Sequence, residues 1–435
     1  MAKRALLCGC NYPGSSHALN GCVNDVNAMY SMLTTHFGFA TENITKLIDT
    51  DPSGEQPTGA NIKRHLTELV AASQPGDVLF FHYSGHGTQV PSDHEEADAK
   101  DEALCPTDMN TITDDDLRTI FVNLADGVKV TVVADCCHSG TLLDQPEVQI
   151  SGPKSDDPAA PPQLVDTFTA AAGGADNRDV GCRALPVDSF VAALGEKLGV
   201  AVAPNQARAA MVAAFGSDAS AKLGPLIQKF QGALDAAGGA EALAAQCREQ
   251  LGPLIQKFQG ALDAAGGAEA LAAQATAKLD ELVPGAGGAL GGLLGGVLGG
   301  GGGGSSRGIG SSLFSLALEM LGSADVAQQL PPAGAKPSPD AQLPPGRGLL
   351  ITGCQAEETS ADACPSGDAS QAFGALTNAL TTTVNQFKQA YPDHNISART
   401  LVAHIRESLN AARFAQNPCL ECDAANADAP FVLGA

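Results

Sequence analysis

Two apolar segments constrain the fold of this chain more than any other feature. Val78–Ser84 and Val128–Ala134 are nearly continuous in apolar residues, as strands buried on both faces are. Two further segments share this character, Arg4–Gly9 and Asn43–Ile48. Helical patterns separate these four segments, at Val23–Phe37, Ala60–Ala72 and Asp114–Leu124. The alternation predicts an α/β fold whose mostly parallel sheet is flanked by helices.

Composition divides the 435 residues into three regions, 1–145, 146–345 and 346–435. The middle region begins and ends in Pro-rich text and contains the same 24-letter text, LGPLIQKFQGALDAAGGAEALAAQ, at Leu223–Gln246 and Leu251–Gln274. A Gly-rich run follows the second copy. Two copies are fewer than the roughly three that a stable solenoid needs, so we expect a duplication within a long, partly flexible insert.

The last region regains the composition of a folded domain. We expect a buried strand at Gly348–Thr352, helices at Ala369–Gln386 and Ser397–Arg413, and a final short strand at Pro430–Leu433. A long linker adds only logarithmically to the entropy of loop closure, so the sheet begun before the insert can continue here. The sequence therefore predicts one core in two pieces.

The charge balance limits the classes of partner. Lys and Arg total 25 and Asp and Glu total 48, which gives a net charge of -23. Such a chain disfavours nucleic acid and anionic membranes and suits cationic substrates or divalent cations. The Gly-rich run buries too little side chain for an integral membrane segment, and the N-terminal apolar run of about five residues is too short for a signal peptide.

Cysteine usage points to a reducing compartment. Twelve cysteines are scattered through a long chain that lacks a secretory signal, which favours reduced thiols and a cytoplasmic location. Cys419 and Cys422 form a single CxxC pair. Without a second pair at zinc-like spacing, we interpret them as two free thiols rather than as metal ligands.

The two longest apolar segments end in residues that suit nucleophilic catalysis. The first runs into His86, whose neighbours Gly85 and Gly87 are small, unlike the large apolar neighbours of a typical core histidine. The second runs into Cys136 and Cys137, followed by small and polar residues. In parallel sheets, sites form at the carboxyl ends of strands, where an imidazole can take the proton of a thiol. Backbone N–H groups at the two glycines could form an oxyanion hole.

These motifs resemble those of metacaspases, the caspase-like cysteine peptidases of plants, algae, fungi and protists. HYSGHG is followed about fifty residues later by DCCHSG, a His-to-Cys separation typical of caspases. The text GLLITGCQAEETSADACPSGDASQAFGALTNAL resembles the small-subunit segment of the family. With no N-terminal prodomain and a long linker, the layout resembles type II: a large-subunit region at 1–145, a linker with the autoprocessing region at 146–345, and a small-subunit region at 346–435.

The resemblance implies roles for individual residues. Cys137, immediately before His-Ser-Gly, would be the nucleophile and His86 its partner, with Cys136 where the family usually has Ser. The resemblance also implies a pocket for a substrate Arg or Lys, lined by Asp25, Ser84 and Asp135, and a second family cysteine of uncertain role at Cys22. Two carboxylates in such a pocket would bind a guanidinium and exclude Asp.

Dense acidic text at 93–116 suggests a cation site. A solvated acidic surface is the alternative, and no EF-hand spacing is present. Clustered carboxylates can supply the oxygens that Ca²⁺ needs, and the family is typically activated by Ca²⁺. The resemblance implies the ligands Asp98, Asp101, Asp115, Asp116 and Asp144.

We therefore expect a calcium-dependent cysteine endopeptidase that cleaves proteins after Arg or Lys. It would be made as a monomeric zymogen, act in stress or cell-death-related proteolysis, and cut its own linker at Arg208, with Arg183 and Lys222 as further candidates. A non-peptidase scaffold that handles protein aggregates is one alternative. A dithiol redox protein that uses Cys136 and Cys137 is another, although adjacent cysteines form only a strained disulfide.

Overall fold

The computed structural model describes residues 1–91, 100–137, 148–151, 178–199, 201–215, 218–220, 343, 346–355, 358–365 and 367–434. The repeated and Gly-rich text lies outside this part of the chain. Two compact units are distinguished: Met1–Phe190, Asp218–Lys222 and Ala333–Ala435 form the first, and Val191–Ser217 and Leu223–Pro332 form the second. All the strands and most of the helices described below belong to the first unit.

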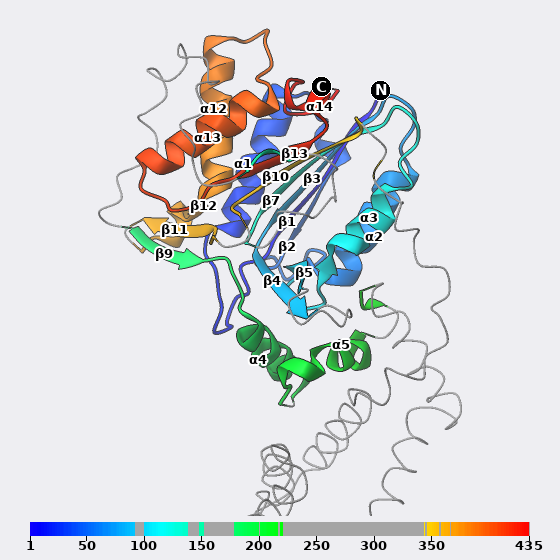
Figure 1. Ribbon diagram of the computed structural model, residues 1–435, viewed down its shortest axis with the longest axis vertical. Coiled ribbons are helices and arrows are strands. Elements are labelled where there is room, and N and C mark those ends of the chain that lie inside the picture. The colour runs from blue at the N-terminus through cyan, green and yellow to red at the C-terminus, as the bar shows by residue number, and fades with distance from the viewer. Residues whose placement is uncertain are drawn as a thin grey trace, which may run out of the picture. The chain divides into compact units, whose positions relative to one another are not determined.

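A seven-stranded sheet, counted over the described residues, forms the centre of the first unit (Figure 1). Its strands, in spatial order, are β2 (Ile44–Ile48), β1 (Lys3–Gly9), β3 (Val78–Ser84), β7 (Lys129–Asp135), β10 (Gly348–Thr352), β13 (Cys419–Cys422) and β8 (Val148–Ile150). The first five are parallel, and β13 and β8 are antiparallel to their neighbours. Because β10 pairs with β7, the sheet continues across the insert, which confirms one core in two pieces.

Helices cover both faces of this sheet (Figure 1). On one face lie α1 (Cys22–His36), α12 (Ala375–Ala390) and α13 (Ala398–Ala411), and on the other lie α2 (Gly59–Ala71) and α3 (Asp114–Phe121). The periodic apolar residues of the first group, such as Met29, Leu380 and Ile405, are fully buried against Phe80 of β3 in one apolar cluster. None of the described helices is long and apolar enough to cross a membrane.

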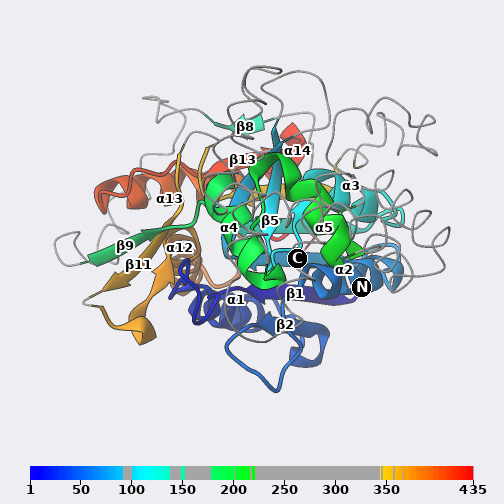
Figure 2. The ribbon, with the colours of Figure 1, turned by 90° about the horizontal axis from the view of Figure 1, so that it is seen from below.

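Two smaller three-stranded sheets lie beyond the carboxyl ends of β3 and β7. One contains β4 (His86–Pro91), β5 (Lys100–Cys105) and β6 (Ile112–Thr113). The other contains β12 (Phe373–Gly374), β11 (Ala361–Pro365) and β9 (Arg178–Cys182), so that the beginning of the linker lies beside the small-subunit region (Figure 2). Short elements complete the described chain: η1 (Thr41–Asn43), α4 (Val187–Leu198), η4 (Pro204–Gln206), α5 (Ala207–Phe215), η7 (Ala369–Gln371) and α14 (Ala424–Ala427).

Two sequence predictions for the last region are wrong. The helix expected from Ala369 begins only at Ala375, because Phe373 and Gly374 pair with β11 as β12 and Ala369–Gln371 forms only the single turn η7. The strand expected at Pro430–Leu433 is only an isolated bridge between Pro430 and Ser397. Its apolar side chains fill the helix-covered core instead of forming a ladder. The CxxC pair lies in β13, where both cysteines are buried.

Candidate functional site

Strand register brings His86 and Cys137 to the same place. Ser84 at the end of β3 pairs with Asp135 at the end of β7, and each of the two reactive residues follows its strand end by two positions. The backbones then touch: a Cβ atom on Gly87 would lie 1.8 Å from the Cys137 carbonyl oxygen. Only glycine fits at position 87, which explains the small residue beside His86.

The surroundings of His86 select one imidazole tautomer. Nε2 lies 2.7 Å from the backbone carbonyl oxygen of His17, so this nitrogen carries the proton, and the Tyr12 ring lies beside the imidazole with centroids 4.9 Å apart. Nδ1 is buried and has no hydrogen-bond partner. Burial lowers the pKa of His86 to about 4, so the ring is neutral at physiological pH. An unpartnered lone pair at Nδ1 is suited to accepting a proton.

Cys137 is buried among hydrogen-bonding groups. Its Sγ accepts the backbone N–H of Ser360 at 2.8 Å. A hydrogen bond from the Cys182 thiol lowers the pKa of Cys137, but a hydrogen bond to Cys354 and burial together raise it well above its ordinary value. The thiol is therefore protonated in this state and requires a base to become a nucleophile.

A buried arginine occupies the pocket that the sequence assigned to a substrate. The side chain of Arg183 is 0% exposed. Its Nη2 lies 2.8 Å from Asp25 and 2.9 Å from Asp362, and its Nη1 lies 3.3 Å from Asp135 and donates to Ser84 Oγ at 2.8 Å. The structure thus brings Asp25, Ser84 and Asp135 together around one guanidinium and adds a third carboxylate.

Neighbouring groups hold the two predicted carboxylates in place. Asp135 accepts from the backbone N–H and the hydroxyl of Thr377, both at 2.8 Å, and Asp25 accepts from the N–H of Gly374 at 2.9 Å. A Cβ on Gly374 would lie 2.3 Å from the guanidinium, so a larger residue would fill the pocket. Burial raises the pKa of Asp25 to about 6, although the charge of Arg183 opposes this shift.

The backbone around Arg183 is bound in an extended form. Its N–H donates to the carbonyl of Ser360, and its carbonyl accepts the N–H of Gly87, both at 2.9 Å. Leu185 N–H donates to the Gly87 carbonyl at 2.8 Å, and the preceding residues, β9, pair with β11. Residues on both sides of the Arg183–Ala184 bond are therefore anchored, and the Arg183 carbonyl faces an N–H donor beside the Cys137 backbone.

The other predicted processing residues lie elsewhere. Arg208 is half-buried in helix α5 of the second unit, where burial lowers its pKa to about 10. Lys222 lies outside the described residues. Cys22 is buried at the start of α1, close enough to the pocket for its thiol to hydrogen-bond with Ser84.

The predicted calcium ligands are described only in part. Asp98 and Asp144 lie outside the described residues, and only the backbone of Asp101 is described. Asp116 caps α3 by accepting from Thr113, and Asp115 pairs with Arg118. Within the described residues, no three His, Cys, Asp or Glu side chains gather as metal ligands would. The calcium site stays a prediction.

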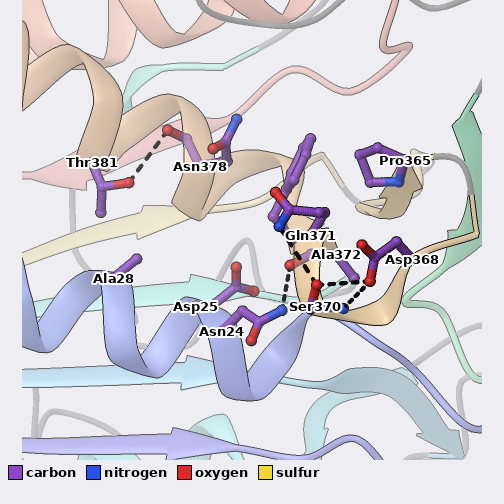
Figure 3. Close-up of a pocket in the computed structure, with 11 residues that line it drawn as sticks. Asn24, Asp25, Ala28, Pro365, Asp368, Ser370, Gln371, Ala372, Asn378 and Thr381 are labelled. Atoms are coloured by element: carbon purple, nitrogen blue, oxygen red, sulfur yellow. Dashed lines mark hydrogen bonds between the residues drawn. The ribbon is translucent and has the colours of Figure 1, made fainter.

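A separate polar cavity of about 520 Å³ adjoins the arginine pocket (Figure 3). Asp25 lines it together with residues of α1, α12 and the β11–β12 connection. Its polar side chains satisfy one another: Asn24 donates to the Ala372 carbonyl at 2.8 Å, and Ser370 donates to Asp368 at 2.7 Å. Asp25 therefore lines this cavity and also binds Arg183.

Sequence reasoning missed several residues of the site. Asp362 and Ser360 lie in and beside β11, within text assigned to the small-subunit region but given no role. His17 accepts the His86 hydrogen bond through its backbone carbonyl, a role that no sequence pattern reveals. The acidic residue between small ones in SADACP is the one signal that could have identified Asp362.

Removing the buried guanidinium should destabilise the protein strongly. In a Cys137→Ala background, Arg183→Ala leaves three buried carboxylates without a cation and should lower the free energy of unfolding by about 3–5 kcal/mol. Arg399→Ala is the matched control, because Arg399 pairs at 3.0 Å with the 72% exposed Asp428, and should cost no more than about 1 kcal/mol. Urea unfolding followed by circular dichroism measures both.

The loss of unfolding free energy caused by Arg183→Ala should also depend on pH. The pKa of Asp25 in the folded state, about 6, is above its ordinary value, and losing Arg183 raises it further. A carboxyl whose pKa is raised in the folded state makes the folded protein less stable as pH rises through that pKa. The unfolding free energy lost in Arg183→Ala should therefore be smaller near about pH 5 than near about pH 7.5. An equal loss of unfolding free energy at both pH values would contradict the claim that Arg183 neutralises buried carboxylates.

Comparisons with known proteins agree with the motif resemblance. Residues 3–146 match the family model described as "Metacaspase, peptidase C14 domain". Metacaspase-4 of Arabidopsis thaliana is 31% identical over 478 positions, covering 99% of this chain and 100% of that protein. Metacaspase-6 of the same plant is 32% identical, also covering 99% of this chain and 100% of its own length. The chain therefore belongs to the metacaspase family and is a cysteine-type endopeptidase.

Proposed function

We propose that this chain is a calcium-dependent cysteine endopeptidase that cleaves after Arg or Lys and begins as a zymogen that cuts itself after Arg183. One observation carries the proposal. The Arg183 side chain fills an acidic pocket while its carbonyl accepts the Gly87 N–H at 2.9 Å. This is the placement expected of a substrate residue before the scissile bond.

The residues around Cys137 support nucleophilic catalysis. His86 Nδ1 takes the thiol proton, and the sulfur attacks the carbonyl of the residue in the acidic pocket. Negative charge develops on the carbonyl oxygen, where the Gly87 N–H already donates, so this group contributes to an oxyanion hole. His86 then protonates the leaving amine, and water releases the acyl-enzyme. The His17 carbonyl accepts the Nε2 hydrogen bond in both the neutral and the protonated ring, which leaves Nδ1 as the nitrogen that takes and returns the proton.

The pocket chemistry supports basic specificity. Asp25, Asp135 and Asp362 surround the guanidinium of Arg183, and all three are nearly inaccessible to solvent. An anionic substrate side chain would be desolvated against like charges, so Asp is excluded. A lysine ammonium can reach the same carboxylates, although without the bidentate geometry of a guanidinium.

Arg183 replaces Arg208 as our leading autoprocessing residue. A peptidase binds its substrate extended, and the Arg183 segment is extended and held at both ends. Arg208 lies within helix α5, so its peptide bond would have to leave the helix first. Tethering gives the Arg183 bond a high effective concentration at the nucleophile.

Self-cleavage should occur after Arg183 and depend on Cys137 and His86. After Ca²⁺ addition, mass spectrometry of the wild type should detect an N-terminal fragment that ends at Arg183. The Arg183→Gln variant should lose this cut, because an uncharged amide cannot neutralise the acidic pocket, whereas Arg208→Gln should keep it. Cys137→Ala and His86→Ala should stay intact, and Cys136→Ala should retain substantial cleavage.

Two results would contradict this assignment. One is the Arg183 fragment appearing unchanged in Cys137→Ala. The other is self-cleavage that depends on Arg208 and is indifferent to Arg183.

Asp362 should contribute to cleavage after Arg as Asp25 and Asp135 do. We expect Asp362→Asn to lower kcat/KM for Arg-terminated fluorogenic peptides about 30-fold or more, since one charge of a desolvated pair is lost. Rates are normalised to active sites counted with an irreversible thiol inhibitor, which separates substrate recognition from maturation. Asp428→Asn, at a 72% exposed carboxylate, is the control. An unchanged rate in Asp362→Asn would remove Asp362 from the pocket.

Calcium activation is proposed at the acidic end of the β5–β6 hairpin. Ala103 pairs with Thr113; Asp101 lies two residues before Ala103 in β5, and Asp115 lies two residues after Thr113, in the first turn of α3. Their carboxylates are hard oxygen donors of the kind that Ca²⁺ takes, and Asp116 follows in the same turn. The family resemblance adds Asp98 and Asp144. Because Arg118 pairs with Asp115, cation binding would compete with this ion pair.

Chelator should therefore silence the enzyme, and Asp115→Asn should raise the Ca²⁺ needed for half-activation by about tenfold, because an anionic oxygen is lost. Calorimetric titration of Ca²⁺ into Cys137→Ala protein gives a readout that is independent of activity. Asp126→Asn, at an exposed residue paired with Arg347, is the control. Full activity in excess chelator would contradict the calcium site and would favour the alternative, that the acidic segment at 93–116 is a solvated surface.

A further inference from the structure

The segment that carries Arg183 also places a second thiol, that of Cys182, beside Cys137. Cys182 immediately precedes Arg183 and pairs with Ala361 in the β9–β11 ladder. The adjacent Ser360 donates its N–H to Cys137 Sγ at 2.8 Å, so the same stretch of chain holds both cysteines. The Cys182 thiol donates a hydrogen bond to Cys137 Sγ and accepts the Ala184 N–H at 3.2 Å.

Exposure distinguishes Cys182 from the other thiols. Among the cysteines in the described ranges, Cys182 alone is exposed, and the rest, Cys137 included, are buried. A small oxidant from solvent therefore meets Cys182 first. Cys354 also contacts Cys137, but it is 0% exposed and its thiol points to the Glu358 carbonyl at 3.4 Å.

We propose that Cys182 is a redox-modification site, at which a peroxide links its sulfur to that of Cys137 in a reversible disulfide. The inference rests on the proposed function in one respect: the nucleophile that is blocked is the one assigned above. The disulfide would tie the linker to the nucleophile, and with the sulfur of Cys137 bonded to Cys182 the Arg183 carbonyl could not be attacked. Calcium could then not start self-cleavage.

The chemistry balances with hydrogen peroxide as the oxidant. The Cys182 thiolate attacks one peroxide oxygen and forms a sulfenic acid as hydroxide leaves. Cys137 sulfur then attacks the Cys182 sulfur, the S–S bond forms, and the sulfenic oxygen leaves as water with the Cys137 proton. Two thiols and one peroxide give one disulfide and two waters. A dithiol reductant reverses the reaction by two thiol–disulfide exchanges.

The two steps should differ in rate. Hydrogen bonding to Cys137 and burial raise the pKa of Cys182, so little thiolate is present at neutral pH and the first step is slow. The second step needs only the approach of two sulfur atoms already in hydrogen-bond contact. Oxidation of Cys182 therefore requires sustained exposure to peroxide. Once the Cys182 sulfenic acid has formed, Cys137 reacts with it before the sulfur is oxidised further.

The test uses full-length zymogen kept in chelator, so that no cleavage precedes oxidation. Protein is treated with hydrogen peroxide, free thiols are alkylated, and peptic peptides are mapped at acid pH without reductant. A peptide pair joined through Cys137 and Cys182 is expected. A disulfide joining Cys137 to Cys354 or Cys136, or no Cys137 disulfide at all, would overturn the proposal.

A second measurement follows recovery of self-cleavage. Peroxide-treated protein should stay intact with Ca²⁺ and cleave after dithiothreitol is added. Cys182→Ser should be much less inhibited by the same peroxide treatment, with at least about fivefold more Ca²⁺-triggered cleavage than the oxidised wild type before dithiothreitol is added, because its buried, protonated Cys137 has no neighbouring Cys182 sulfur with which to form the disulfide. Cys364→Ser, on β11, is the matched control and should recover as the wild type does. Equal inhibition of Cys182→Ser and of the wild type by peroxide would contradict the proposal.

Failure of the proposed function gives a different pattern. If reduced wild type does not cut itself after Arg183, the autoprocessing assignment fails. The disulfide map needs no cleavage and still decides whether the two sulfurs join.

Discussion

The buried ion cluster around Arg183 is the constraint on which the rest of the site depends. One guanidinium faces three carboxylates with almost no access to water, and each carboxylate comes from a different part of the chain: Asp25 from α1, Asp135 from β7 and Asp362 from β11. Desolvation on this scale is tolerated only when every charge has close partners. The Thr377, Gly374 and Ser84 hydrogen bonds supply them. The pocket thus joins the two halves of the interrupted domain.

Much of the fold could be predicted because its signals are local. Continuous apolar runs identified β1, β3, β7 and β10, and the 3.6-residue pattern identified α1 and α13 within a few residues. Strand order at the carboxyl edge then explains why His86 and Cys137 meet, since the register of β3 and β7 fixes both positions. The resemblance to metacaspases selected Asp25, Ser84 and Asp135, and the structure gathers all three around one guanidinium.

The remaining features depend on pairing between distant segments. Asp362 reaches the pocket through the pairing of β11 with both β9 and β12, and neither β9 nor β11 has a strong apolar pattern. The same ladder extends Arg183 and favours it over Arg208, whose local sequence resembled a processing site but forms a helix. The late start of α12 has a similar origin, since the β11–β12 pairing overrides the helical preference of the residues before it. Local helix or strand propensity does not reveal such competition from pairing between distant segments.

The anchoring of the Arg183 segment on both sides has a kinetic consequence. Under the proposed self-cleavage after Arg183, cutting this one bond would leave the upstream piece paired with β11, with its guanidinium still beside three carboxylates. The new carboxylate terminus and the loss of the tether would weaken its binding, but this first product would still compete with substrates for the cleft. On that proposal, the active site of a mature molecule would become fully available only when its own cleaved end dissociates. The rate of dissociation as well as the rate of the chemical step would then set the onset of proteolysis.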